Sequence, residues 1–211
     1  MEKMKAYEQR FLTPEITELR TDKKTGVISG YAIVFNSRSV LLYGQFYERI
    51  VPEAVDGVIE KSDCMALLDH NRSRGILGRS KFGEGTLKLT PDKKGVFAEF
   101  TPPDTALASE VGQYIERGEI DSMSFEFFLA EKGDRWEEIK GGKYERTILK
   151  FEEIRDVSLV FQPAYPETTA AIRSLNEFRG VEELKPAPKL SLTQLNEYYA
   201  EFEETLKQYK K

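Results

Sequence analysis

The sequence of 211 residues has very few of the side chains that bind transition metals or form cross-links. It contains one histidine, His70, and one cysteine, Cys64. A single cysteine excludes an intrachain disulfide, in keeping with a reducing compartment, and one His and one Cys cannot supply a Cys/His zinc cluster. The glycine-rich phosphate-binding patterns GxxxxGK(S/T) and GxGxxG are missing as well. We therefore expect neither a metal nor a cofactor, and any catalysis has to rest on ordinary side chains with at most one imidazole.

Long apolar runs and a large surplus of one charge are also lacking. No run approaches the ~18–20 apolar residues that span a bilayer, and the first segment, MEKMKAYEQRFL, is charged throughout, unlike a signal peptide. The 31 basic and 36 acidic residues are interspersed, and the net charge is −5. Because no basic stripe is present, the sequence offers little to a phosphate backbone. We expect a protein of the cytoplasm, of a host or otherwise, whose partners include neither a membrane nor nucleic acid.

The sequence does contain enough apolar material for one core, since 40% of its residues are hydrophobic. Its length corresponds to one domain with a short appendage. Period-two alternation and turn signals predict a mainly β fold with some helix, of the α+β class. Strands are expected at 15–20, 27–35, 62–70, 86–90, 96–101, 120–130 and 151–161, with a hairpin-like excursion around 136–142. The segment FYERIVPEAV is interpreted as a short helix.

Two longer helices are predicted beside the strands. Residues 104–117 place apolar side chains at i, i+4, i+7 and i+8, with Asp104 as the expected N-cap and Gly118 just past the end. After a segment rich in Pro and Lys, SLTQ has the form of a capping box and opens a second apolar stripe. We therefore divide the chain into a folded domain over 1–180, a linker over 181–190 and a detachable amphipathic helix over 191–211.

His70 is the side chain best suited to proton transfer near neutral pH, because the usual pKa of histidine is about 6.5. It stands in LLDHNRSRGILGR, where a strand ending in Asp-His-Asn enters a polar loop. The imidazole is thus expected at a strand end, near solvent. Taken alone, however, a histidine that merely forms hydrogen bonds at a strand end is the favoured interpretation.

Two later strands carry polar residues of interest. In GEIDSMSFEFF, alternation puts Ser124 on one face with Ser122 and Glu126, which taken alone is best interpreted as the solvent side of a sheet. In FEEIRDVSLVF, Asp156 shares a face with Ile154 within a very apolar strand. An Asp bonded to an imidazole would fix its tautomer and stabilise its charged form. An Asp in a structural salt bridge is equally well supported, and the residues leave both interpretations open.

Cys64 is a rival nucleophile that the spacing argues against. It lies six residues before His70 on the same predicted strand, which is roughly 20 Å at ~3.3 Å per residue. An extended strand therefore excludes a direct pair between the two side chains. A buried structural cysteine is expected instead.

Taken together, five segments resemble the prohead protease family of HK97-type tailed bacteriophages. They are GYAIVFNSRS, ERIVPEAV, LLDHNRSRGILGR, GEIDSMSFEF and RDVSLVFQPAYPET, which occur in the family's order within residues 27–168. The specific part is the succession of a His followed by LGR, then SMSF, then VSLV-x-x-PAYP. The sequence departs from the family at Asp156, where Glu is common, and at ERIVPEAV, where Pro-Gly-Ala-Phe is more usual.

The resemblance implies a fold like that of the herpesvirus capsid protease, a closed antiparallel β-barrel flanked by helices. It places the family's nucleophilic serine on Ser124, its histidine on His70 and its acidic residue on Asp156. Arg79, in LGR, is a candidate to stabilise the oxyanion, although an ion pair with a carboxylate such as Asp69 is at least as well supported. The implied activity is that of a serine endopeptidase inside the immature capsid, which cleaves the major capsid protein or a scaffold segment, and also itself.

Two other functions stay open at this point. A catalytically inactive capsid-assembly or scaffold module would share the fold, and an esterase-like hydrolase would share the residues. The presence of both His70 and Ser124 favours activity over the scaffold interpretation. The sequence determines neither the cleavage-site preference nor the virus, and it leaves a homo-oligomer open.

Overall fold

The computed structural model describes residues 7–161 and 169–180. The chain divides into two units, Met1–Leu175 and Asn176–Lys211. The predicted linker over 181–190 and the predicted helix over 191–211 lie outside the described residues, as does the PAYP segment of the family motif. The division into domain, linker and terminal helix therefore stays a prediction.

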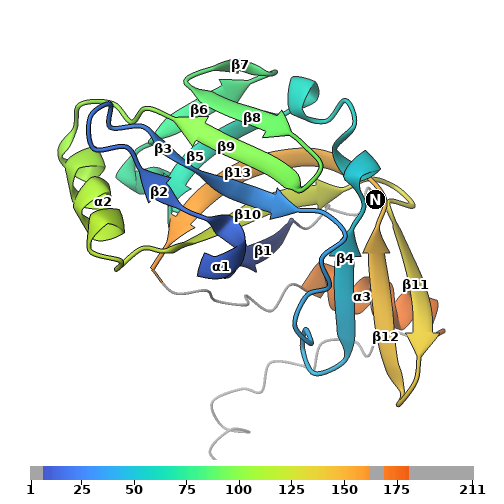
Figure 1. The fold of residues 1–211 in the computed structure, drawn as a ribbon. Helices are drawn as coiled ribbons and strands as arrows, with labels where there is room; N and C mark the ends of the chain where they lie inside the picture. The colour runs from blue at the N-terminus through green and yellow to red at the C-terminus, as the bar shows by residue number, and fades with distance from the viewer. Residues whose placement is uncertain (1–6, 162–168, 181–211) are drawn as a thin grey trace, which may run out of the picture. The chain divides into compact units, whose positions relative to one another are not determined.

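The largest sheet holds six strands in the order β1-β10-β13-β5-β6-β7 (Figure 1). These are β1 (Glu8–Leu12), β10 (Ser122–Leu129), β13 (Phe151–Val160), β5 (Asp63–Leu68), β6 (Gly78–Lys81) and β7 (Glu84–Gly85). Neighbouring strands are antiparallel except β13 and β5, which run parallel. The central strands β10 and β13 are long and largely buried because their sequences are rich in aromatic and β-branched residues, which fit a pleated interior.

A four-stranded antiparallel sheet packs against the first sheet, and the two share one hydrophobic core. Its order is β2-β3-β9-β8, with β2 (Arg20–Thr21), β3 (Ile28–Val34), β9 (Gly95–Phe100) and β8 (Leu87–Pro91). Ile33 and Phe100 from this sheet lie in the same core as Phe125 and Val157 of the other. The predicted hairpin over residues 86–101 is confirmed by the pairing of β8 with β9.

A third sheet has the order β11-β12-β4 and contains β11 (Asp134–Ile139), β12 (Lys143–Ile148) and β4 (Phe46–Ile50). The predicted excursion around residues 136–142 is the β11–β12 hairpin. Gly141 and Gly142 form its turn with φ of +86° and +68°, a left-handed backbone that glycine adopts without strain. A second, smaller core lies on this sheet and consists of Leu42, Phe46, Trp136, Ala171 and Leu175. The last two of these residues belong to helix α3 (Thr169–Phe178).

Helix α2 (Ala106–Glu116) confirms the predicted helix, with one correction at its start. The N-cap is Thr105 rather than Asp104, because the Thr105 hydroxyl accepts a hydrogen bond from the N–H of Ala108 at 3.3 Å. Gly118 follows the helix end with φ of +73°, as expected for a residue that ends a helix.

Two other predicted elements differ in type. Residues 15–20 were expected to be a strand, but Pro14–Thr17 form a short helix, α1, which begins with a proline whose fixed φ suits a first helical position. FYERIVPEAV was expected to be a helix, but its first half is strand β4. Only Pro52–Val55 are helical, as the 3-10 helix η1; two further 3-10 helices are η2 (Ile59–Lys61) and η3 (Arg72–Arg74).

The predicted fold class is correct in its coarser part, since the unit is mixed α+β and consists mostly of strands. The predicted closed barrel is not supported. Within the described residues the strands form three separate sheets, each with two end strands. In the largest sheet, β1 pairs with β10 at one end and the two-residue strand β7 pairs with β6 at the other, so that this sheet does not close on itself.

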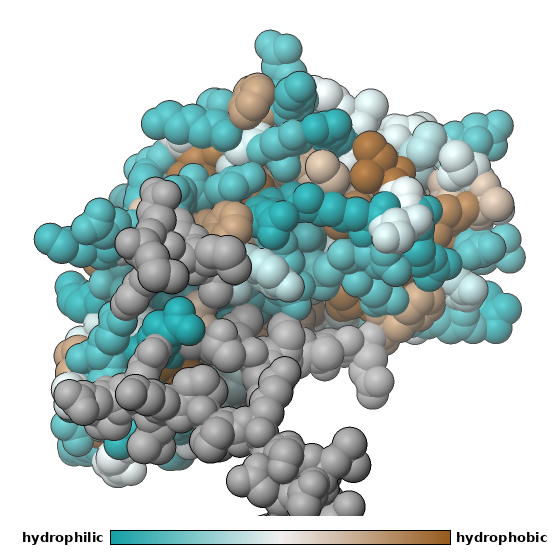
Figure 2. Space-filling view, turned by 180° about the vertical axis from the view of Figure 1, so that it is seen from behind, coloured by the Kyte–Doolittle hydropathy of each residue, from teal (hydrophilic) through white to brown (hydrophobic). Residues whose placement is uncertain are grey.

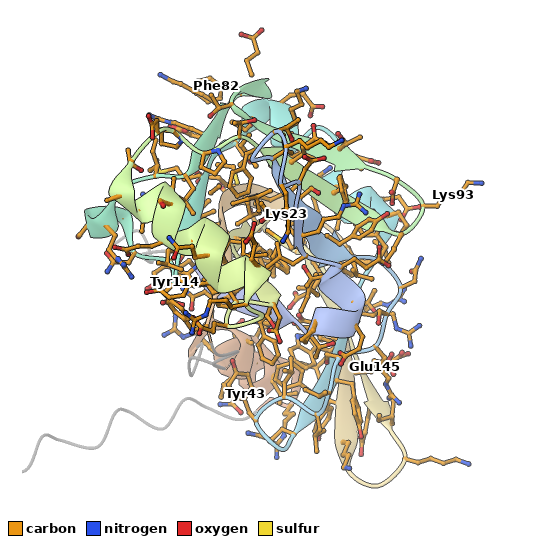
Figure 3. The ribbon with its side chains drawn as sticks, turned by 60° about the vertical axis from the view of Figure 1, so that its left-hand side comes forward. Lys23, Tyr43, Phe82, Lys93, Tyr114 and Glu145 are labelled. Carbon is orange, nitrogen blue, oxygen red and sulfur yellow. The ribbon has the colours of Figure 1, made fainter. Side chains whose placement is uncertain are left out.

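Figure 2 shows one face of the molecule, where hydrophilic residues cover most of the coloured part and apolar residues are scattered between them. Figure 3 shows Lys93, in the β8–β9 hairpin, pointing away from the molecule. Among helices within the described ranges, none has the length and apolar character needed to span a membrane.

Candidate active site

Ser124 lies in the middle of β10, on the face turned away from the main core. Phe125 and Phe127 belong to that core, so strand alternation directs Ser124 to the opposite face, as predicted. The neighbouring strands fix its position, with Phe11 of β1 opposite it on one side and Ser158 of β13 on the other. Ser124 is only 5% exposed. Its hydroxyl is therefore buried within the sheet, on a strand that pairs with β1 on one side and β13 on the other.

His70 follows β5 in a tight turn. Asp69 and His70 both have positive φ, 50° and 55°, and the N–H of Asn71 donates to the carbonyl of Leu68 at 3.0 Å. Few L-residues adopt this backbone, although Asp, Asn and His tolerate it better than most. Such strained residues persist only where surrounding contacts hold them, and they are frequent at functional sites. The Asp-His-Asn sequence thus suits a turn that reverses the chain and directs the imidazole back toward the sheet.

Strand β13 supplies the contacts that hold this turn. The N–H of Asp69 donates to the carbonyl of Leu159 at 2.9 Å, and the N–H of His70 donates to the hydroxyl of Ser158 at 3.2 Å. The Asp69 carboxylate in turn accepts from the N–H of Phe161 at 3.3 Å. Because β13 runs parallel to β5, its carboxyl end lies beside the turn and can make all three contacts.

A β-bulge in β13 sets the direction of Asp156. Glu126 of β10 pairs with Asp156, but the next residue, Phe127, pairs with Ile154, so that Arg155 is an extra residue in β13. Ile154 packs in the core, whereas Asp156 lies on the face of Ser124. The prediction that Ile154 and Asp156 share a face is therefore wrong, because the bulge interrupts the alternation between them.

These elements bring Ser124, His70 and Asp156 into one hydrogen-bonded chain. Nδ1 of His70 is 2.6 Å from Oδ1 of Asp156, and Nε2 is 2.8 Å from Oγ of Ser124. In a neutral imidazole that faces a carboxylate, Nδ1 carries the proton and donates it, which leaves Nε2 to accept from the serine hydroxyl. The His70 side chain is 15% exposed and that of Asp156 is 2% exposed. This arrangement suits proton transfer from Ser124 to His70.

Ser158 is a further member of the site, which sequence reasoning missed. Its hydroxyl donates to Oδ1 of Asp156 at 2.8 Å and accepts from the backbone N–H of His70. It is fully buried and thus ties the carboxylate to the histidine turn. The available signal in the sequence was its place two residues after Asp156, on the same face of the predicted strand.

The carbonyl of Arg10, on β1, gives the Ser124 hydroxyl a second acceptor at 3.0 Å. The hydroxyl has one proton, which goes either to this carbonyl or to Nε2 of His70. When His70 is protonated, Nε2 becomes a donor, and the Arg10 carbonyl is the acceptor that remains for Ser124. The guanidinium of Arg10 holds β1 in place through bonds to Glu8 and Glu48.

Glu126 places a second carboxylate beside this chain. A ring nitrogen of His70 and one carboxylate oxygen from each of Glu126 and Asp156 lie within 4.8 Å of one another. Glu126 is 6% exposed and accepts hydrogen bonds from Gln9 at 3.0 Å and from Arg155 at 2.8 Å. These side chains are of types that bind metals, but the 2.6 Å contact between His70 and Asp156 is shorter than the ~3 Å that separates two ligands of one tetrahedral zinc ion. The observed geometry is that of a hydrogen-bonded site.

Arg79, the oxyanion candidate, lies on β6 and forms an ion pair with Asp63 on the neighbouring strand β5. Its guanidinium donates to both carboxylate oxygens of Asp63, at 2.7 and 2.5 Å. This bond to Arg79 lowers the pKa of the Asp63 carboxyl. The carboxylate partner is thus Asp63 rather than Asp69, and the oxyanion role of Arg79 stays a prediction.

Cys64 is a free and fully buried cysteine in the main core, as predicted. Burial raises the pKa of its thiol well above the ordinary value. Since the thiolate is the reactive form, this cysteine is poorly suited to be a nucleophile.

The chain matches the family model of the caudovirus prohead serine protease over residues 13–182. Among solved structures, it is similar to the capsid assembly protease of bacteriophage T4, gp21, with 10% sequence identity and a TM-score of 0.40. The similarity covers 73% of this chain and 95% of that chain. No significant match was found among curated proteins.

The family match spans well over half of the chain and contains Ser124, His70 and Asp156. The family is one of serine proteases that act in the prohead, the immature capsid. This chain therefore belongs to the caudovirus prohead serine protease family and is a serine protease of capsid maturation.

Proposed function

We propose that this protease cleaves segments of the major capsid protein or of a scaffold, and also its own chain, inside the prohead in the host cytoplasm. Ser124 is the nucleophile, His70 the general base and Asp156 the residue that orients His70. The observation that carries the proposal is the hydrogen-bonded chain from Ser124 through His70 to Asp156, with separations of 2.8 and 2.6 Å. Residence in a prohead supports capsid and scaffold proteins as the substrates, because they are the proteins that build this compartment.

The first half of the reaction forms an acyl-enzyme. Oγ of Ser124 attacks the carbonyl carbon of the scissile peptide bond while Nε2 of His70 takes the hydroxyl proton. The electron pair of the C=O bond moves to the oxygen and gives a tetrahedral oxyanion. When this pair returns, the C–N bond breaks, and His70 donates its proton to the leaving amine. Water then enters and repeats the sequence, with His70 first taking a proton from water and later returning one to Ser124.

Asp156 assists through charge and hydrogen bonding. In the neutral state its carboxylate fixes the proton on Nδ1, so that Nε2 faces Ser124 as an acceptor. After proton transfer His70 is positively charged, and the adjacent carboxylate stabilises that charge. Because Asp156 is almost fully buried, water screens this attraction weakly. Ser158 keeps the carboxylate oriented toward the ring.

The test compares Ser124→Ala, His70→Ala and the double variant with the wild-type chain on a co-expressed capsid protein and scaffold. Each single change is expected to lower the rate of cleavage by up to ~10⁶-fold. The rate of the double variant should be only slightly lower, because the two residues act as one unit. Mass spectrometry of the products also reports whether the protease trims its own ends.

Ser122→Ala is the matched control, because Ser122 lies on the same strand and face but bonds to Asp121 at 2.7 Å. This variant should cleave normally. Processing of the capsid protein by the Ser124→Ala variant would contradict the proposed nucleophile. A wild-type chain that binds capsid proteins without cutting them would favour an inactive assembly module, and hydrolysis of small esters alone would favour an esterase.

A further inference from the structure

We infer that Glu126 is a second acidic residue acting on His70, one that stabilises the imidazolium together with Asp156. This inference deepens the proposed function and rests on His70 being the general base. Glu126 touches neither the nucleophile nor a reacting atom in the described contacts, so it is a positioning residue whose action passes through His70.

The first support is the position of the Glu126 carboxylate. One of its oxygens lies within 4.8 Å of both a ring nitrogen of His70 and a carboxylate oxygen of Asp156. Glu126 is two residues from Ser124 on the same face of β10 and pairs directly with Asp156 on β13. At this separation, and with 6% exposure, a negative charge interacts strongly with a charge that develops on the imidazole.

The second support is the way the neighbouring strands hold this carboxylate. Gln9 of β1 donates to Oε2 at 3.0 Å, and Arg155 of β13 donates to Oε1 at 2.8 Å. Arg155 is the extra residue of the β-bulge, so the irregularity that directs Asp156 toward His70 also supplies the cation that holds Glu126. Glu126 is thus held in one orientation beside the histidine and is paired with the cation of Arg155.

The charged groups around His70 determine whether a substitution should make the imidazole easier or harder to protonate. From β10 it faces Ser124 and Glu126, and from β13 it faces Asp156 and Ser158; its own turn adds Asp69, whose carboxylate accepts from the Phe161 N–H. Arg155 pairs with Glu126 and partly offsets the negative charge of Glu126 near His70. Removal of the Glu126 charge should make it harder to protonate His70, whereas removal of the Arg155 charge should make it easier.

The decisive measurement is the protonation of the imidazole itself, which is unambiguous because the chain has a single histidine. We would follow the ring nitrogens of His70 by NMR against pH in the full chain, with Ser124→Ala in every sample to prevent self-cleavage. Glu126→Gln should move the pH at which His70 gains its proton down, and Arg155→Gln should move it up by a smaller amount. A general loss of structure cannot shift the titration of His70 in opposite directions in the two variants, since Glu126 and Arg155 belong to one ion pair.

Glu145→Gln is the matched control. Glu145 is also buried, and it is also held by cationic side chains, those of Arg38 and Arg49. It lies on β12 in another sheet, as Figure 3 shows by its place beside β4 and β12. Its replacement should leave the titration of His70 unchanged.

Kinetics provide the second measurement, with Ser124 intact. In Glu126→Gln the acid limb of kcat/KM against pH should move down with the NMR titration, and kcat should fall roughly tenfold with little change in KM. An unchanged His70 titration in both Glu126→Gln and Arg155→Gln, or a shift of both in the same direction, overturns the inference. If His70 titrates as expected but the Ser124→Ala chain still cleaves substrate, the proposed function fails while the inference about the charges stands.

Discussion

Two groups of buried polar and charged residues lie on opposite faces of the pair β1–β10, and each uses its own carboxylates in a different way. On one face is the Ser–His–Asp cluster, formed by Ser124, His70, Asp156 and Ser158. On the other is a group that we call the ion cluster, formed by Glu8, Arg10, Glu48, Asp134 and Arg146. The two are linked at Arg10, whose carbonyl accepts from Ser124 while its guanidinium belongs to the ion cluster.

In the ion cluster every charged side chain has a partner of opposite charge. Arg146, which is completely buried, donates to Glu8, Glu48 and Asp134 over 2.6–3.0 Å. Burial by itself would raise the pKa of Glu8, but the charges of Arg146 and Arg10 lower it to about 2. Burial opposes the charged form of Arg10 as well, yet Glu48 and Glu8 raise its pKa above the ordinary value. The ion pairs of this cluster join β1 to β4 and β12.

The two clusters show that the partner of a buried carboxylate determines what its charge can do. A guanidinium keeps its proton under all ordinary conditions, so a Glu–Arg cluster holds strands together. An imidazole gains and loses a proton near neutral pH, so an Asp–His pair can transfer one. Substitutions in the two clusters should therefore have different effects, on catalysis in one and on stability in the other.

The largest effect is expected for Asp156→Asn. The shape is kept but the charge that stabilises the imidazolium is lost, so turnover should fall by up to ~10⁴-fold and still leave measurable activity. Single-turnover cleavage of a scaffold peptide, normalised to folded protein, measures this loss. Asp156→Glu restores the charge and should recover much of the rate. A near-normal rate for Asp156→Asn would remove Asp156 from the catalytic group and leave a Ser–His dyad.

Arg146→Met should act on stability instead. It leaves the carboxylates of Glu8 and Glu48 buried without one of their cations, which should lower the free energy of unfolding by about 3–5 kcal/mol. Denaturant titration measures this change. The rate per folded molecule is expected to stay within a few-fold of wild type. If the rate fell as far as in Asp156→Asn, the separation of the two clusters into different roles would be wrong.

The pH dependence of stability should show the depressed pKa of Glu8. Its pKa is about 2 in the folded chain, against an ordinary value of 4.5, so its stabilisation is complete above pH 4.5. It is lost as the pH falls from about 4.5 to about 2, by roughly 3 kcal/mol in total. Unfolding free energies of Ser124→Ala chains with and without Glu8→Gln measure this. The difference between the two chains should shrink across that window, and a constant difference would contradict the prediction.

The smallest effect is expected for Ser158→Ala. The Asp156 carboxylate loses one donor and the His70 N–H loses its acceptor, but the Ser124–His70–Asp156 chain is kept. One hydrogen bond to a charged group corresponds to about 10- to 100-fold in rate. A drop in kcat with little change in KM is the expected signature. Equal rates for this variant and wild type would show that the histidine turn is held without Ser158.

Local patterns in the sequence were sufficient to predict several features of the site. Strand alternation in SMSFEFF directed Ser124 away from the core, and the Asp-His-Asn sequence allowed a turn with positive φ at His70. The composition left His70 as the sole imidazole available to act as a base. Burial of Cys64 followed from its place in an apolar strand. Each of these depends on residues that are neighbours in the chain.

The contacts between distant segments could be seen only in the folded chain. His70 contacts partners that lie 54 and 86 residues away in the sequence, and the direction of Asp156 depends on a bulge that exists only through the register between β13 and β10. The separate sheets in place of a closed barrel also follow from which strands pair. Alternation predicts faces within one strand, but pairing and bulges are set by hydrogen bonds to another strand. For the same reason, the contacts of Ser158, Glu126 and Arg10 with the site appeared only once the strands were in place.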